Sequence, residues 1–261
     1  MNSSPRCRLL TAATLLALAA AAPQAGADDR RFVFMDEARV TPPGGREFEQ
    51  WITWQHETKD HNDFNLFQFK EELELGINPH MQVGLEIPNW HFQTGPAGER
   101  QGPRFDTIGA DIRYIFLDPT KDSIGLAVKP EIEFSDKDFE IAGRLTLQKN
   151  FDKTELVYNA TIEAAWEDDG VSEFRERNGE FSEALGASFE VSQGTFVGVE
   201  LLHEIPMPNW KTGEENQNVF VGPNFSSHHT NWAFTIAPLF RVTPSDEEPR
   251  FQVRMILEVD F

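Results

Sequence analysis

Serine and histidine side chains that could form an activated nucleophile stand together at Ser226-Ser227-His228-His229. A serine hydroxyl beside a histidine base is the arrangement used by hydrolases that act through a covalent intermediate. These residues fall between two predicted strands, at a short connection. The position favours a polar turn with ordinary histidines, and we expect no enzyme.

Metal-binding side chains give a weaker pattern. His56-Glu57 and His61 resemble a zinc-protease pair, but that motif needs two histidines four residues apart on one helix face. Here the spacing is five, in a strand followed by a turn, so the two imidazoles would diverge. Acidic loop residues at Glu167-Asp168-Asp169 are a weak alternative for divalent cations. We expect no metal site and no cofactor.

Alternating charged and apolar residues dominate the chain from Arg46 onward. The period of two continues through segments of about nine to thirteen residues, which predicts long strands with one apolar and one polar face. We expect about twelve strands, near 47–58, 65–76, 81–92, 105–116, 124–134, 139–151, 155–167, 182–191, 195–205, 219–225, 231–242 and 250–261.

Short and longer connections alternate between these strands. The longest connections are Thr94–Arg104, Asp168–Glu180 and Pro206–Asn218. Short turns on one side, longer loops on the other and an even strand number are typical of outer-membrane barrels, whose strands of about 9 to 11 residues cross the bilayer. The predicted fold class is all-β, a transmembrane antiparallel up-and-down β-barrel. Aromatic girdles are expected at Phe116, Phe151, Trp232 and Phe261 near the short turns and at Phe134, Phe139 and Trp166 near the loops.

The amino-acid composition excludes several other classes of protein. The chain has 261 residues and a net charge of −20, from 43 acidic and 23 basic residues, and such a surface repels nucleic acid. Apolar residues make up 39% and the mean hydropathy is −0.44, which excludes a helical membrane bundle. The 22 Phe and 6 Trp are too many for a disordered acidic chain.

The amino-terminal stretch has the features of a secretory signal peptide. Arg6 and Arg8 precede an apolar stretch, Leu9–Ala22, and a cleavage site is predicted between Ala27 and Asp28. The expected organisation is a signal peptide at 1–27, a periplasmic or plug segment at 28–45 and a barrel at 46–261. The 28–45 segment is too interrupted by proline and glycine for a confident strand, so a luminal plug, an extra edge strand and a disordered tail stay open.

The carboxy-terminal residues Arg254–Phe261 alternate and close on a terminal phenylalanine. This ending resembles the signature that Gram-negative outer-membrane proteins present to their assembly machinery, which would make Phe261 part of that signal. Four further stretches resemble an uncharacterised family of outer-membrane β-barrels: 47–51, 74–76 with 82–85, 114–119 and 147–151. The resemblance implies a porin-like barrel and transfers no catalytic residue.

If the apolar parity faces lipid, the other parity lines the lumen. Its acidic members outnumber its basic ones, which predicts a negative, partly hydrated lumen that favours cations. We expect the negative electrostatic field of the lumen to come mainly from Glu72, Glu86, Asp111, Glu131 and Glu163. The narrowest part of the channel would be shaped by Arg113, Lys129 and Arg144. The complete predicted set is Lys70, Glu72, Glu74, Glu86, Asp111, Arg113, Lys129, Glu131, Glu133, Glu140, Arg144, Glu163, Glu190, Glu200, Arg254 and Glu258.

We therefore expect a monomeric or weakly oligomeric channel for small polar or cationic solutes, in the outer membrane of a Gram-negative bacterium. Its partners would be membrane lipid, lipopolysaccharide and the barrel-assembly machinery. The alternatives are a closed barrel that binds partners through its outer loops and, less favoured, a lipid hydrolase, for which Ser226 would lie in the wrong leaflet. Two features depart from the pattern: Glu71 lies on the apolar parity, and Trp90 and Phe92 fall off it unless a bulge occurs near Pro88.

Overall fold

The computed structural model describes residues 30–58, 61–95, 102–167, 176–211, 217–244 and 249–261. The predicted signal peptide, with Ala27 and Asp28, lies outside these residues, as do the loop acids Asp168 and Asp169. No helix among the described residues is long and apolar enough to cross a membrane. The strands are β1 (Arg46–His56), β2 (Asn65–Asn78), β3 (Met81–Thr94), β4 (Arg104–Phe105), β5 (Ile108–Leu117), β6 (Gly125–Phe134), β7 (Asp138–Phe151), β8 (Thr154–Glu167), β9 (Glu176–Ser192), β10 (Thr195–Pro208), β11 (Asn218–His228), β12 (Trp232–Arg241) and β13 (Phe251–Asp260).

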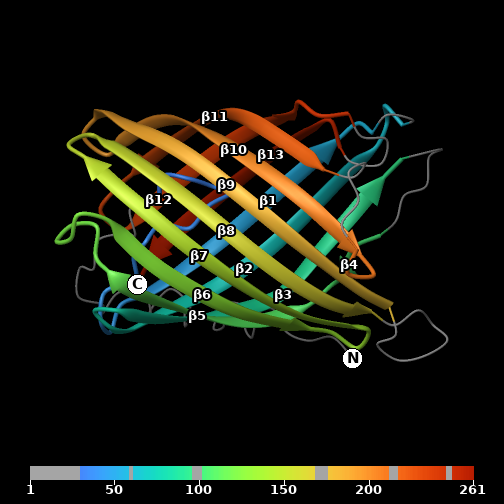
Figure 1. Cartoon of the computed structure of the whole chain (residues 1–261), viewed down its shortest axis with the longest axis horizontal. Coiled ribbons are helices and arrows are strands. Elements are labelled where there is room, and N and C mark those ends of the chain that lie inside the picture. The colour runs from blue at the N-terminus through green and yellow to red at the C-terminus, as the bar shows by residue number, and fades with distance from the viewer. Residues whose placement is uncertain (1–29, 59–60, 96–101, 168–175, 212–216, 245–248) are drawn as a thin grey trace, which may run out of the picture.

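These strands form one antiparallel sheet that closes on itself (Figure 1). Neighbours in sequence pair around the wall, and β1 closes the ring by pairing with β13 from Glu47↔Asp260 to His56↔Phe251. The two-residue β4 pairs with β3 beyond the end of β5, so β4 and β5 occupy the same position in the wall, next to β3. Counted as one strand, they make the barrel twelve-stranded. The predicted fold class is confirmed.

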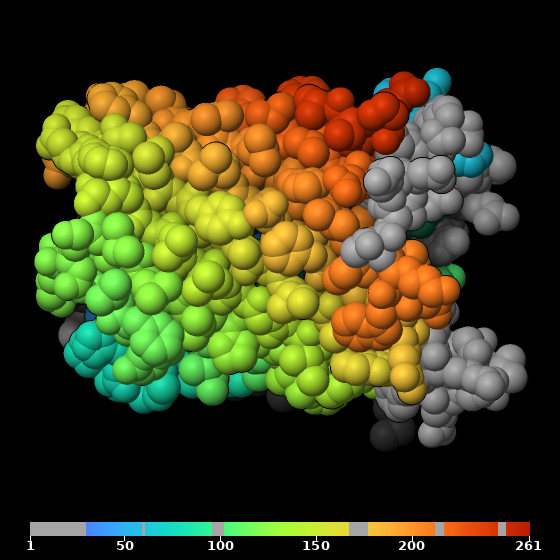
Figure 2. Space-filling model, viewed as in Figure 1, coloured from blue at the N-terminus to red at the C-terminus, as the bar shows by residue number. Residues whose placement is uncertain are grey.

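The apolar parity of the strands forms the outer surface. Ile112, Ile162 and Leu185 are each about half exposed, whereas the polar residues between them are buried or half-buried. Figure 2 shows the side chains of the green, yellow and orange strands packed side by side across this wall. A barrel surrounded by lipid is expected to alternate in this way, with polar groups inside and apolar groups outside.

The predicted bulge near Pro88 is confirmed. Between β2 and β3 the register shifts from Phe69↔Trp90 to Glu71↔Ile87, so Pro88 and Asn89 together oppose one residue of β2. The extra residue returns Trp90 to the outward face, where its ring stacks on Phe69 at 3.9 Å between centroids. Glu71 stays on the outward face, in register with Ile87 and, on β1, with Gln50.

Several strands are longer than the alternation predicts, and one is interrupted. β9 begins at Glu176, within the predicted loop Asp168–Glu180, because its backbone continues the pairing with β8 and β10 although its side chains there are polar. The predicted strand 105–116 is broken between Phe105 and Ile108, where backbone bonds to Asn89 take over. Polar strand ends carry no apolar alternation, and the ladder of backbone hydrogen bonds does not require it.

Candidate functional site

Residues 30–41, which we call the luminal segment, lie inside the barrel. Nine of the twelve are buried and the other three are half-buried, and the blue trace in Figure 1 runs within the end that carries the short turns. Gly45 donates to the Pro42 carbonyl (2.8 Å), and Gly44 has a φ of +80°, a conformation that glycine adopts without strain. This turn joins the luminal segment to β1.

Inward side chains of many strands bind the backbone of the luminal segment. The Glu200 carboxylate accepts from the Val33 and Phe34 N–H groups at 3.0 and 2.9 Å. The other donors are Asp36, Ala38 and Thr41, whose N–H groups bond to Asn159, Gln148 and Gln82 at 2.7, 2.7 and 2.8 Å. Buried backbone groups without a strand partner must be satisfied in this way. The segment is therefore held by specific bonds although it forms no strand.

An apolar patch on the inner wall receives the middle of the segment. Phe32, Val33, Phe34 and Met35 pack against inward residues of β8 to β13, namely Val157, Ala184, Leu202, Phe220, Ala237, Leu239 and Ile256. A Cβ at Gly186 would stand 2.1 Å from the Met35 Cε and 2.5 Å from a Phe32 ring atom. The wall is thus shaped to this segment, and this part of the lumen is apolar although the inward parity was predicted to be mainly charged and hydrated.

Asp36 is the electrostatic centre of the segment. Its carboxylate lies 3.0 Å from Arg113 Nη2, 3.5 Å from Lys129 Nζ and 2.5 Å from Arg144 Nη1. The Asp36 side chain is 2% exposed, so these cations compensate a charge that water scarcely reaches. All three cations belong to the set predicted as the constriction.

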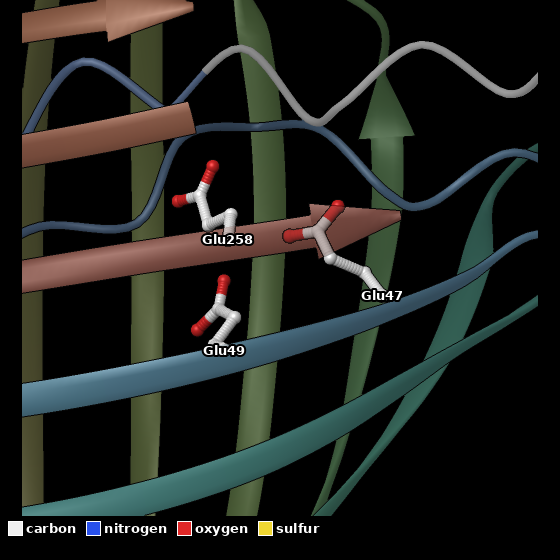
Figure 3. A group of neighbouring side chains, drawn as sticks. All are labelled: Glu47, Glu49 and Glu258. Atoms are coloured by element: carbon white, nitrogen blue, oxygen red, sulfur yellow. The ribbon is translucent and has the colours of Figure 1, made fainter. Parts of the chain in front are cut away.

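Arg30 lies among acidic side chains, whereas Asp36 lies among basic ones. Its guanidinium lies 2.9 Å from a Glu49 oxygen and 2.9 Å from a Glu258 oxygen, and 4.9 Å from the centre of the Trp51 ring. Figure 3 shows Glu47, Glu49 and Glu258, from β1 and β13, with their carboxylates gathered near the blue chain of the segment. Their ligand atoms lie within 4.8 Å of one another. Such an acidic group attracts a cation, and Arg30 contacts two of its three carboxylates, those of Glu49 and Glu258.

The lumen contains a cavity of about 420 Å³ that borders the luminal segment. Val33 and Phe34 contribute to its lining, together with Trp51, Lys129 and Arg144. Five carboxylic and four cationic side chains line it, so the cavity carries a slight excess of negative charge.

Comparison with known proteins identifies the family. Residues 24–253 match a family described as "Family of unknown function (DUF6662)". The chain belongs to this family. No curated protein matches the chain.

Two solved structures similar to this DUF6662 member are an outer-membrane channel and a porin. The COG4313 outer membrane channel from Pseudomonas putida F1 has a TM-score of 0.59 at 12% identity, over 88% of this chain and 100% of that chain. The NanC porin has a TM-score of 0.52 at 7% identity, over 82% of this chain and 98% of that chain. At these identities the likeness shows the fold, which is that of an outer-membrane β-barrel resembling channels and porins.

The predicted lumen residues of the DUF6662 member all point inward in the structure. Those that are buried are Glu72, Glu74, Glu86, Asp111, Arg113, Lys129, Glu200 and Glu258, and those that are half-buried are Lys70, Glu131, Glu133, Glu140, Arg144, Glu163, Glu190 and Arg254. Their role along a conducting path stays a prediction. The structure brings Lys70 to Glu86, Lys129 to Glu131 at 2.9 Å, and Arg113 to Glu74 at 3.7 Å.

The sequence-based set omits several inward residues. Glu47, Glu49 and Glu155 share the polar parity of β1 and β8 and could have been found from the period of two. Arg30 and Asp36 have no such signal, because the luminal segment has no strand period. Arg39 also belongs here, since its guanidinium bonds to Glu155.

Ser226, Ser227 and His228 lie at the end of β11, and not in a turn as predicted, whereas His229 begins the connection to β12. Ser226 Oγ and His228 Nε2 are 2.5 Å apart, a contact that a hydrolase would need. However, Ser226 is 1% exposed, faces the lumen and donates to the Arg30 carbonyl at 2.9 Å. The pair therefore anchors the luminal segment, and the structure favours no hydrolytic role for it.

Proposed function

We propose that this protein is a gated channel of the Gram-negative outer membrane for small polar solutes, with a preference for cations. The cavity above the luminal segment carries the proposal, because it provides a polar, charge-lined space within a barrel whose outer face is apolar. The luminal segment lies buried inside the barrel and borders this cavity through Val33 and Phe34, so it would act as the gate. Both ends of the barrel chain lie at the short-turn end, which would face the periplasm.

The first test is conductance of the refolded mature chain in a planar bilayer with a salt gradient. We expect current steps whose reversal potential shows preference for cations. Heat-modifiable gel mobility would establish that the protein is folded. A folded protein that never conducts would contradict the proposal and favour a closed barrel, whose binding loops lie largely outside the described residues.

Neutralising the cavity should weaken its selectivity. Glu131→Gln with Glu133→Gln removes two carboxylates that line the cavity, and we expect the cation-to-anion permeability ratio to fall by roughly twofold or more. Glu71→Gln is the matched control, because Glu71 lies on the outward face. Unchanged selectivity in a conducting double variant would contradict an acidic selectivity filter.

Insertion would require the barrel-assembly machinery, and lipid and lipopolysaccharide would surround the wall. We expect Phe261→Ala to lower the amount of assembled protein several-fold, since the terminal aromatic ring is proposed as the recognised feature. The backbone bond from Phe261 N–H to the Arg46 carbonyl, 3.1 Å, would be kept. Phe151→Ala, which removes an outward ring near another short turn, is the control. Equal assembly of the two variants in membrane fractions would refute this role.

A further inference from the structure

The luminal segment places two opposite charges in two adjacent pockets of the wall. The cation pocket consists of Trp51, Glu49 and Glu258 and holds the Arg30 guanidinium. Trp51 Nε1–H also donates to Glu49 at 2.6 Å, which fixes this carboxylate beside the ring. An aromatic face next to two carboxylates is suited to a guanidinium or an ammonium group.

The anion pocket consists of Arg113, Lys129 and Arg144 and holds the Asp36 carboxylate. Arg113 approaches one carboxylate oxygen, while Lys129 and Arg144 approach the other. Lys129 also approaches Glu131 and Arg113 approaches Glu74, but the three cations converge on the Asp36 carboxylate. Their convergence point therefore suits an anion, whether from the chain or from solution.

The two pockets adjoin each other and the cavity. Arg30 Nη1 and Asp36 Oδ1 are 3.3 Å apart, so the cationic and anionic groups that they accept are close neighbours. Trp51, Lys129 and Arg144 line the cavity of about 420 Å³ as well as contacting the segment. A solute in the cavity would thus meet one side of each pocket before the segment moves.

We propose that these pockets form a binding site for a small zwitterion that carries a carboxylate and a guanidinium or ammonium group a few ångströms apart. Arg30 and Asp36 are the chain's own substitutes for the two ends of this solute. Solute and segment compete, so binding releases the segment from the wall. This inference rests on the proposed function, because the solute reaches the pockets through the channel.

The test uses the full mature chain with Arg30→Ala and Asp36→Ala, which leaves both pockets open to solution. The probe is guanidinoacetate, and its two halves, methylguanidinium and acetate, serve as controls at the same millimolar concentration. A ligand that binds only the folded state raises the melting temperature. We expect guanidinoacetate to raise it by several degrees, more than methylguanidinium and acetate combined, and to have a smaller effect on the wild-type chain.

Adding Glu49→Gln and Arg144→Gln to the double variant should abolish the shift. Equal shifts from guanidinoacetate and the mixture of its halves, or a shift that survives these two substitutions, would overturn the proposal. If the double variant does not fold, Asp36→Asn replaces it with acetate as the probe. Acetate should then raise the melting temperature of Asp36→Asn more than that of the wild type, and equal shifts would overturn the anion pocket.

Conductance separates this inference from the proposed function. A chain that conducts but shows no preference for guanidinoacetate is a channel without this site. A chain that binds guanidinoacetate but never conducts has the site, and the proposed channel fails.

Discussion

Asp36→Ala is expected to destabilise the barrel and to raise its conductance. The substitution leaves Arg113, Lys129 and Arg144 around an empty position, and removing one partner of a buried ion pair costs about 3 to 5 kcal/mol. The luminal segment would lose its strongest contacts, so the fraction of time spent open should rise. Loss of the Asp36 negative charge should also shift the reversal potential towards anions.

Thermal unfolding followed by heat-modifiable mobility, together with bilayer recordings, would measure these effects. Asp136→Ala is the control, since Asp136 is exposed in the turn between β6 and β7. A barrel that keeps both its wild-type melting temperature and its wild-type current after loss of Asp36 would show that the ion pairs do not hold the segment.

Gly186→Val should displace the segment through its apolar side. Even the first added carbon would overlap Met35 and Phe32, and the two methyl groups of valine enlarge the clash. Valine suits a strand, so β9 itself should tolerate it. We expect a stability loss of about 1 to 3 kcal/mol, typical of overpacking, and a clear gain in conductance because the segment no longer fits the wall.

Gly143→Val is the matched control, because a Cβ at Gly143 meets nothing within 4 Å. Protease digestion of the folded variants adds a second readout, since a released segment becomes accessible to cleavage after Arg30, Arg31 and Arg39. Equal protection of the segment in both variants would mean that close packing at Gly186 does not retain it.

The wall of the barrel could be predicted from the sequence because its side chains must alternate. Each strand has one face towards an apolar surrounding, so the period of two marks both the strands and their inward residues, as in Glu72, Glu74 and Glu86. Even the bulge at Pro88 could be inferred, because Trp90 and Phe92 otherwise break the parity.

The content of the lumen could not be predicted in the same way. Residues 30–41 bind the wall through backbone groups, a short apolar run and single charges, and these leave no period in the sequence. The partners of Asp36 come from β5, β6 and β7, which only the closed barrel brings together. The surplus of luminal acids could be seen in the sequence, but the ion pairs of Arg30 with Glu49 and of Arg39 with Glu155 could not.

The position of Arg30 also bears on how the barrel is completed. Glu49 of β1 and Glu258 of β13 are register partners across the pair of strands that closes the ring. Like charges directly opposite each other on two strands repel, and Arg30 lies between them at 2.9 Å from each. The Arg30 guanidinium therefore lowers the electrostatic cost of pairing the first and last strands. We therefore expect the segment to enter the barrel before this seam closes, which a chain lacking residues 30–41 would test by closing more slowly.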